Sequence, residues 1–174
     1  MKHRAPLIVQ EYSARWPVLY EEERSLLLRS LPAAHFQVEH IGSTAVPGLP
    51  SKPIVDMMLG AWSLSLIDAQ LTVLQNLGYE YMPQHELEIP DRRFFAKPVV
   101  RPRTVHLHGL QIGGSRWNAH LKFRNQLRAS PELSERYASL KKTLAAQFKD
   151  DRAAYTEAKS TFIQGVLAAE RGEA

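Results

Sequence analysis

A short loop in the first third of the chain combines residue types that bind anions. Gly42, Ser43 and Thr44 follow a predicted strand, and small residues at such a turn leave backbone N–H groups and hydroxyls free to surround an anion. Lys52 lies later in the same loop and can neutralise a phosphate group as a point charge. These residues predict a phosphate-binding loop, whereas a lone Gly-Ser pair recurs by chance and more often marks only a tight turn.

Three residues outside this loop have side chains suited to metal or proton chemistry. Asp56 lies in the strand after the loop, where a carboxylate can hold a divalent cation that bridges phosphate oxygens. His106 and His108 are two residues apart in another predicted strand, so both imidazoles point to one face and can share a metal ion or approach one phosphate. The alternative is that one or both imidazoles are hydrogen-bonded within the sheet. Asp56, His106 and His108 are the candidate catalytic residues, with Asp56 as the metal ligand.

Basic residues gather in the middle of the chain and offer further anion contacts. Arg93 and Lys97 are candidates to bind phosphate, because guanidinium and ammonium groups pair with phosphate oxygens. A solvated surface is the alternative for any single one of these residues. Arg124 and Lys141, in contrast, are expected to tie C-terminal helices to the sheet. The basic residues of this middle region are Arg92, Arg93, Lys97, Arg101 and Arg103.

The elements before and after the loop can be predicted from the spacing of apolar residues. A helix is expected from Pro17 to about Leu31, because its leucines recur at helical intervals and proline fits a first turn. A strand is expected over residues 36–42, where apolar and polar side chains alternate. A second strand begins at Ile54, so the loop at 42–53, which contains two glycines and three prolines, connects two strands.

The rest of the chain predicts one more helix, a β region and a helical C-terminal third. Residues 63–77 favour a helix, and Gly78 is then the residue just after its end. Helical spacing resumes at Ser115, and Ser130 is expected to cap a further helix that precedes the last one. Three strands are predicted between these helical parts, over residues 79–82, 92–97 and 104–110.

Length and composition limit the class of protein. A chain of 174 residues fits one domain over residues 1–174. The 22 basic and 18 acidic residues form a mixed surface, so a nucleic-acid partner is not implied. Zero cysteines exclude disulfides and thiolate metal sites. No apolar run is long enough to span a membrane, the N-terminal segment MKHRAPLIVQEY lacks the apolar core of a secretory leader, and the cytoplasm is the expected compartment.

The run HIGSTAVPGLPSKPIVD, from His40 to Asp56, closely resembles the signature of the GrpB-like family. The resemblance continues in the same order through Gly78-Tyr79, FFAK at 94–97, HLH at 106–108 and FRNQLR at 123–128, and it reaches KSTFI at 159–163. It therefore covers nearly the whole chain. The family is assigned to the nucleotidyltransferase-like superfamily, which implies an α+β fold with a mixed sheet flanked by helices and a helical C-terminal third.

The chain also departs from the pattern that this resemblance implies. Nucleotidyltransferases of the superfamily generally pair a Gly-Ser turn with two carboxylates spaced D-x-D, which share two metal ions. Here the two positions are Asp56 and Met58, and a thioether is a poor ligand for magnesium. The family also commonly has an acid where this chain has Asn125. Catalysis by an unmodified two-metal mechanism is therefore not expected.

The residues and the resemblance together suggest three functions. The first is binding of a nucleotide or other phosphorylated small molecule, with Mg²⁺ or Mn²⁺ at Asp56 and transfer of a nucleotidyl group to an acceptor. The second is a non-catalytic accessory or interaction module with a protein partner, in keeping with GrpB-like domains attached to dephospho-CoA kinase in some bacteria. The third is metal-assisted phosphate hydrolysis by Asp56, His106 and His108. No membrane partner is implied.

Overall fold

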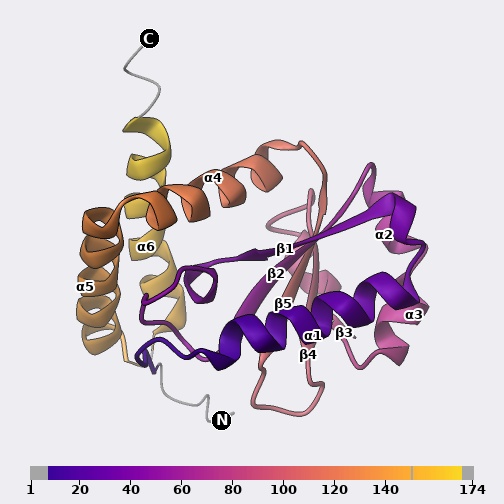
Figure 1. Ribbon diagram of the computed structural model, residues 1–174, viewed down its shortest axis with the longest axis horizontal. Coiled ribbons are helices and arrows are strands. Elements are labelled where there is room, and N and C mark those ends of the chain that lie inside the picture. Colours follow the sequence, from indigo (N-terminus) through magenta and orange to yellow (C-terminus); the bar gives the residue numbers. More distant parts are fainter. Residues whose placement is uncertain (1–7, 150, 170–174) are drawn as a thin grey trace.

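A five-stranded mixed sheet forms the centre of the molecule (Figure 1). A computed structural model describes residues 8–149 and 151–169 of the chain. The strand order is β1-β2-β5-β4-β3, in which β2 and β5 run parallel and the other neighbours run antiparallel. The strands are β1 (Phe36–Ile41), β2 (Val55–Ala61), β3 (Glu80–Tyr81), β4 (Arg93–Lys97) and β5 (Val105–Gln111). This sheet and its helices confirm the predicted α+β class.

The helices lie on both sides of the sheet (Figure 1). One face carries α1 (Arg15–Ser30), α2 (Leu64–Asp68) and α3 (Leu71–Asn76). The helical C-terminal third was also predicted correctly, and it consists of α4 (Ser115–Ala129), α5 (Pro131–Gln147) and α6 (Arg152–Ala169). Of these three, α4 packs on the second face of the sheet, and α5 and α6 pack beside α4. Short 3₁₀ turns span Ala33–His35, Ser43–Ala45 and Pro83–Glu86.

The predicted helix over residues 63–77 is in fact two short helices. Helix α2 ends at Asp68 and α3 begins at Leu71. The apolar spacing could not reveal this break, because Ile67 and Leu74 are both fully buried and lie seven residues apart, which places them on one side in either arrangement.

Gly78 ends α3 as predicted. Its φ of +88° suits glycine, and the Gly78 N–H donates to the carbonyl of Gln75 while the Tyr79 N–H donates to that of Leu74. This pair of hydrogen bonds is a Schellman motif. Because Tyr79 takes part in it, β3 is only Glu80–Tyr81 rather than the predicted 79–82.

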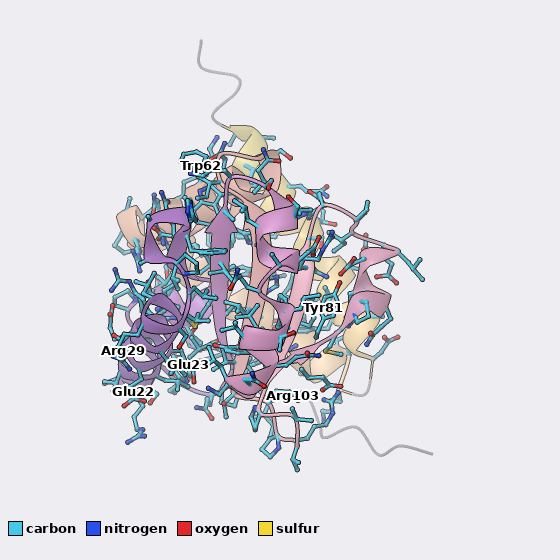
Figure 2. All side chains as sticks on the ribbon, turned by 90° about the vertical axis from the view of Figure 1, so that its right-hand side faces the viewer. Glu22, Glu23, Arg29, Trp62, Tyr81 and Arg103 are labelled. Atoms are coloured by element: carbon cyan, nitrogen blue, oxygen red, sulfur yellow. The ribbon has the colours of Figure 1, made fainter. Side chains whose placement is uncertain are left out.

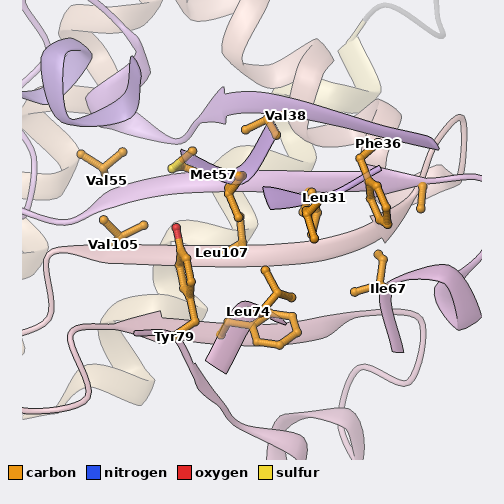
Figure 3. Packing of buried hydrophobic residues seen from close by; sticks show 14 of the residues in the cluster. Leu31, Phe36, Val38, Val55, Met57, Ile67, Leu74, Tyr79, Val105 and Leu107 are labelled. Atoms are coloured by element: carbon orange, nitrogen blue, oxygen red, sulfur yellow. The ribbon is translucent and has the colours of Figure 1, made fainter. Parts of the chain in front are cut away.

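The main hydrophobic core lies under α1, α2 and α3 (Figure 3). Alternation along β2 sends Val55, Met57 and Leu59 into this core, so Asp56 and Met58 point to the second face. Strand β5 repeats the pattern. Its core-facing residues are Val105 and Leu107, and its residues toward the second face are His106, His108 and Leu110.

Helix α4 covers part of the second face and leaves the end near Asp56 to other contacts. Trp117 of α4 packs with Ile41, Met58 and Leu110 in a separate apolar cluster. In the described part of the chain, no helix is long and apolar enough to cross a membrane. Residues 1–7 of the N-terminal segment considered above lie outside the described residues, and the one-domain arrangement stays a prediction.

Replacement of Gly60 by alanine is expected to destabilise the protein. An added Cβ would lie 2.5 Å from Cζ3 of Trp117 and 2.7 Å from Cγ1 of Ile112, so the free energy of unfolding should fall by about 1–3 kcal/mol because of overpacking. Gly165→Ala in α6 is the matched control. There a Cβ meets no atom within 4 Å, and alanine should stabilise the helix by about 1 kcal/mol. Urea denaturation of both variants measures this, and equal effects would contradict the packing.

Candidate functional site

The anion loop begins with a glycine that touches the carboxylate of Asp56. Gly42 has a φ of +69°, and a Cβ added there would lie 3.1 Å from Oδ2 of Asp56. The Ala45 and Val46 N–H groups donate to the carbonyls of Gly42 and Ser43, which closes the chain into a 3₁₀ turn. This close approach needs glycine, both for its left-handed backbone and for the missing side chain.

The carboxylate of Asp56 lies next to His106 and His108, the two histidines predicted for the site. Strand pairing sets Asp56 opposite His106, and Oδ1 of Asp56 lies 3.3 Å from Nδ1 of His106 and 3.5 Å from Nε2 of His108. Burial alone would raise the pKa of Asp56, but hydrogen bonds from both imidazoles and their charge hold that pKa well below its ordinary value. The carboxylate is therefore ionised. The structure thus brings Asp56, His106 and His108 into one cluster on the second face.

His120 of α4 extends this cluster and was missed by the sequence reasoning. Its ring centroid lies 5.9 Å from that of His108, and burial together with the nearby His108 lowers its pKa to about 4. Burial also lowers the pKa of His108, against the charge of Asp56. Nδ1 of His108 is buried and has no hydrogen-bond partner among the described residues. Phe94 of β4 packs edge-on against His106 and His108.

Lys141 of α5 joins the helical third to the loop. Its side chain is 2% exposed, and its Nζ donates to Oγ of Ser43 over 2.8 Å and to the carbonyl of Pro50. Burial, and then the like charge of Lys159, lower the pKa of Lys141 from 10.5 to about 7. Tyr137, one helical turn earlier, also hydrogen-bonds Ser43. The hydroxyl of Ser43 therefore sits among polar groups of α5.

Two more lysines meet at Tyr155 of α6. Nζ of Lys52 lies 4.4 Å from the centroid of the Tyr155 ring, and Nζ of Lys159 lies 4.5 Å from the same centroid. Burial lowers the pKa of Lys159, while the charge of Asp56 opposes that shift. Lys52, within the loop, was predicted to neutralise a phosphate group, and this stays a prediction. Lys141 and Lys159 were not assigned to the site: Lys141 was expected to tie a C-terminal helix to the sheet, and Lys159 was noted only as part of KSTFI at 159–163.

Thr44 and His40 belong to the opposite side of the loop. The hydroxyl of Thr44 is buried and lies 2.9 Å from Nε2 of His40, and the His40 ring stacks on Tyr20 of α1. Burial, followed by the nearby Arg128, lowers the pKa of His40 to about 4. His40 therefore braces the loop as a neutral residue. Thr44 was predicted to help bind a phosphate group, but its hydroxyl faces His40 instead.

Arg93 and Lys97 do not reach the site, because they point to the other face of the sheet. Phe94 pairs with His108 across β4 and β5, so its neighbours in β4 alternate away from the histidines. Arg93 makes a bidentate ion pair with Asp68 of α2, with distances of 2.6 and 3.0 Å. Lys97 donates to Glu23 of α1 over 2.8 Å; Figure 2 labels Glu23 on this helix. Both cations are used in holding helices to the sheet.

Other basic residues also have structural partners. Arg103 is almost fully buried and contacts Glu80 and the carbonyl of Pro98. Arg124 donates to Glu39 over 2.7 Å and to the carbonyl of His40 over 2.9 Å. It thereby ties α4 to β1, the role expected for it.

The position of the second acid of a two-metal site, which the sequence fills with Met58, lies in an apolar cluster. Met58 is 0% exposed in the apolar cluster with Trp117, so its position serves packing. Asp56 supplies one carboxylate, and its Oδ1 faces two imidazoles rather than a second acid. Among the described residues, no group of three or more His, Asp or Glu is placed to hold a metal ion. A Mg²⁺ or Mn²⁺ ion at Asp56 stays a prediction.

The chain is similar to known proteins over most of its length. The family model described as GrpB protein matches residues 6–169. The glutamate-rich protein GrpB of Alkalihalophilus pseudofirmus is 31% identical, over 95% of this chain and 96% of that protein. The UPF0157 protein YqkA of Bacillus subtilis is 34% identical, over 88% of this chain and 44% of that protein. The crystal structure of conserved protein GrpB from Enterococcus faecalis has a TM-score of 0.81 and 36% identity, over 91% of this chain and 94% of that one.

The pH dependence of stability should reveal the charge on Lys141. Because its folded pKa of about 7 is below the unfolded value of 10.5, the unfolded chain binds more protons between these values and stability rises with pH there. From pH 7 to pH 9 the wild type should gain about 2 kcal/mol relative to Lys141→Met, at about 1.4 kcal/mol per pKa unit. Chemical denaturation at several pH values measures the difference. Parallel pH profiles for the two proteins would refute the assigned pKa.

Proposed function

We propose that this chain, which belongs to the GrpB family, binds a nucleotide or another phosphorylated small molecule at the Gly42-Ser43 loop. One observation carries the proposal: the buried ammonium of Lys141 lies 2.8 Å from Oγ of Ser43, with Lys159 close enough to influence its charge. Among the described residues, neither lysine forms an ion pair with a carboxylate within 4 Å. Buried cations are normally paired, so an anionic ligand is the partner that this arrangement lacks.

The lysines define where the phosphates of such a ligand would lie. Lys141 and the hydroxyl of Ser43 donate to one phosphate group at the loop. Lys159 and Lys52, which share the ring of Tyr155, donate to oxygens further along α6. Ammonium groups suit this role because they act as point charges without a fixed bonding direction. A ligand with two or more negative charges would match this set better than a singly charged one.

For nucleotidyl transfer, the cluster at Asp56 would handle the proton of the acceptor. In the proposed step, an acceptor hydroxyl attacks the α-phosphorus of a nucleoside triphosphate, the bond to pyrophosphate breaks, and the lysines hold the departing pyrophosphate. The acceptor proton passes to His106, whose Nδ1 faces Oδ1 of Asp56. An ionised carboxylate beside an imidazole orients the ring and stabilises its protonated form. The same carboxylate and imidazoles were the predicted catalytic residues.

The accessory module remains the second candidate, and Met58 is the observation that favours it. The position of the second acid is fully buried under Trp117, so the fold has used it for packing instead of catalysis. In this candidate the loop binds its ligand without catalysing a reaction, and a protein partner binds the ligand-bound form. No observation among the described residues favours metal-assisted hydrolysis by Asp56, His106 and His108 over these two candidates.

Calorimetric titration with ATP, GTP, CTP and UTP tests the binding proposal. At least one nucleotide should bind, and Lys159→Gln should weaken binding about tenfold, the effect of losing about 1.4 kcal/mol from one charged contact. Lys142→Gln is the matched control, because Lys142 is exposed on α5 and pairs with Glu11. Failure of all four nucleotides to bind would refute nucleotide binding, and equal effects of the two variants would refute the lysine site.

Transfer of label separates the enzyme from the accessory module. With nucleotide labelled at the α-phosphate and a cell extract as the source of acceptor, the wild type should form a labelled product that His106→Ala forms at least about 100-fold more slowly, since general-base catalysis contributes about 10²–10⁴-fold. Binding of nucleotide by His106→Ala is the control for folding. A wild type that binds nucleotide but transfers no label would instead support the accessory module.

A further inference from the structure

We infer that the site binds its phosphorylated ligand without a divalent metal ion, with lysine ammonium groups taking the place that magnesium has in related folds. The inference rests on the proposed function and specifies the charge state of its ligand. The ligand class is then a free polyanion, such as a nucleoside triphosphate or inorganic tripolyphosphate, and not its magnesium complex.

The contacts of Asp56 argue against a magnesium ion at its carboxylate. A Cβ added at Gly42 would lie 3.1 Å from Oδ2, and Oδ1 is shared by His106 and His108 at 3.3 and 3.5 Å. Magnesium requires oxygen ligands in a nearly ideal octahedron, whereas the groups nearest to Oδ1 are imidazole nitrogens, which suit softer metals. The two histidines therefore stand beside Oδ1, where a magnesium ion would need further oxygen ligands.

The cations already present argue the same way. Three lysines lie in the loop or beside it: Lys141 at Ser43, and Lys52 and Lys159 at the ring of Tyr155. After burial, the like charge of Lys159 is the second cause that lowers the pKa of Lys141, so these two ammonium groups already repel each other. A divalent cation would add to this repulsion. A free polyphosphate would relieve it, and it carries more negative charge than its magnesium complex.

The role of the negative charge of Asp56 depends on whether the site holds a metal ion. In a metal site this carboxylate attracts the ligand through the ion it holds. Without a metal, the same carboxylate repels the phosphates, and its contribution is to hold the imidazoles and to balance the lysines when the ligand is absent. The two arrangements therefore predict opposite effects of removing its charge.

Titration of the wild type with ATP and with inorganic tripolyphosphate, in EDTA and in magnesium chloride, tests the inference. We expect both anions to bind in EDTA with a Kd equal to, or a few-fold below, the Kd in magnesium, because the free anion is more highly charged. Binding that is tenfold or more weaker in EDTA would overturn the inference and leave the proposed function standing. No binding of either anion in either buffer would overturn both.

The direction in which Asp56→Asn changes the Kd distinguishes the two arrangements. The isosteric change removes the negative charge, so we expect the Kd for tripolyphosphate in EDTA to fall by a few-fold, whereas a metal-holding carboxylate would make it rise or abolish binding. Asp151→Asn is the matched control: Asp151 is exposed and its Oδ1 caps α6 at Ala154, a role that asparagine keeps. Thermal unfolding of both variants shows that they are folded, and a rise in Kd for Asp56→Asn alone would overturn the inference.

Discussion

The buried ammonium of Lys141 is the contact on which the architecture of the site depends. It crosses from α5 to Oγ of Ser43 and to the carbonyl of Pro50, and so holds both ends of the loop to the C-terminal helices. Arg128 adds a bond from its Nε to the carbonyl of Ala45. A buried charge is costly unless it is compensated, and the loop compensates Lys141 with the hydroxyl of Ser43 and the carbonyl of Pro50. The C-terminal helices therefore contribute to the site as well as packing beside the sheet. They bring to the loop a positive charge that the strands themselves do not provide.

The division of β2 between two faces explains why this site differs from a two-metal centre. Met57 enters the main core under α1, and Met58 enters the smaller cluster under α4, so apolar packing claims both residues after Asp56. The carboxylate lies on the second face and belongs to neither apolar cluster. The parallel pairing of β2 with β5 sets it beside His106. The groups around it are two imidazoles and, from the helical third, Lys159, whose pKa is lowered by burial and raised by the charge of Asp56.

Short-range patterns predicted much of this arrangement, and long-range contacts account for the rest. The two-residue spacing of His106 and His108 correctly placed both on one face, and the loop before Asp56 followed from its glycines and prolines. Arg93 and Lys97 could not be excluded in the same way, because the phase of β4 relative to β5 depends on strand register. Lys141 lies 98 residues after Ser43, and no local pattern reports a contact at that separation. Its helical spacing predicted a helix, but not which strand loop the helix would reach.

The close packing of Gly42 against Asp56 limits how this loop can evolve. A side chain at position 42 would meet Oδ2 of the acid at 3.1 Å and would also have to adopt a left-handed backbone. A larger residue at position 42 is therefore compatible with the fold only if the loop backbone is rebuilt and the acid retreats from it. Loss of that glycine in a homologous sequence would mark a protein whose carboxylate has moved, even where the acid itself is retained.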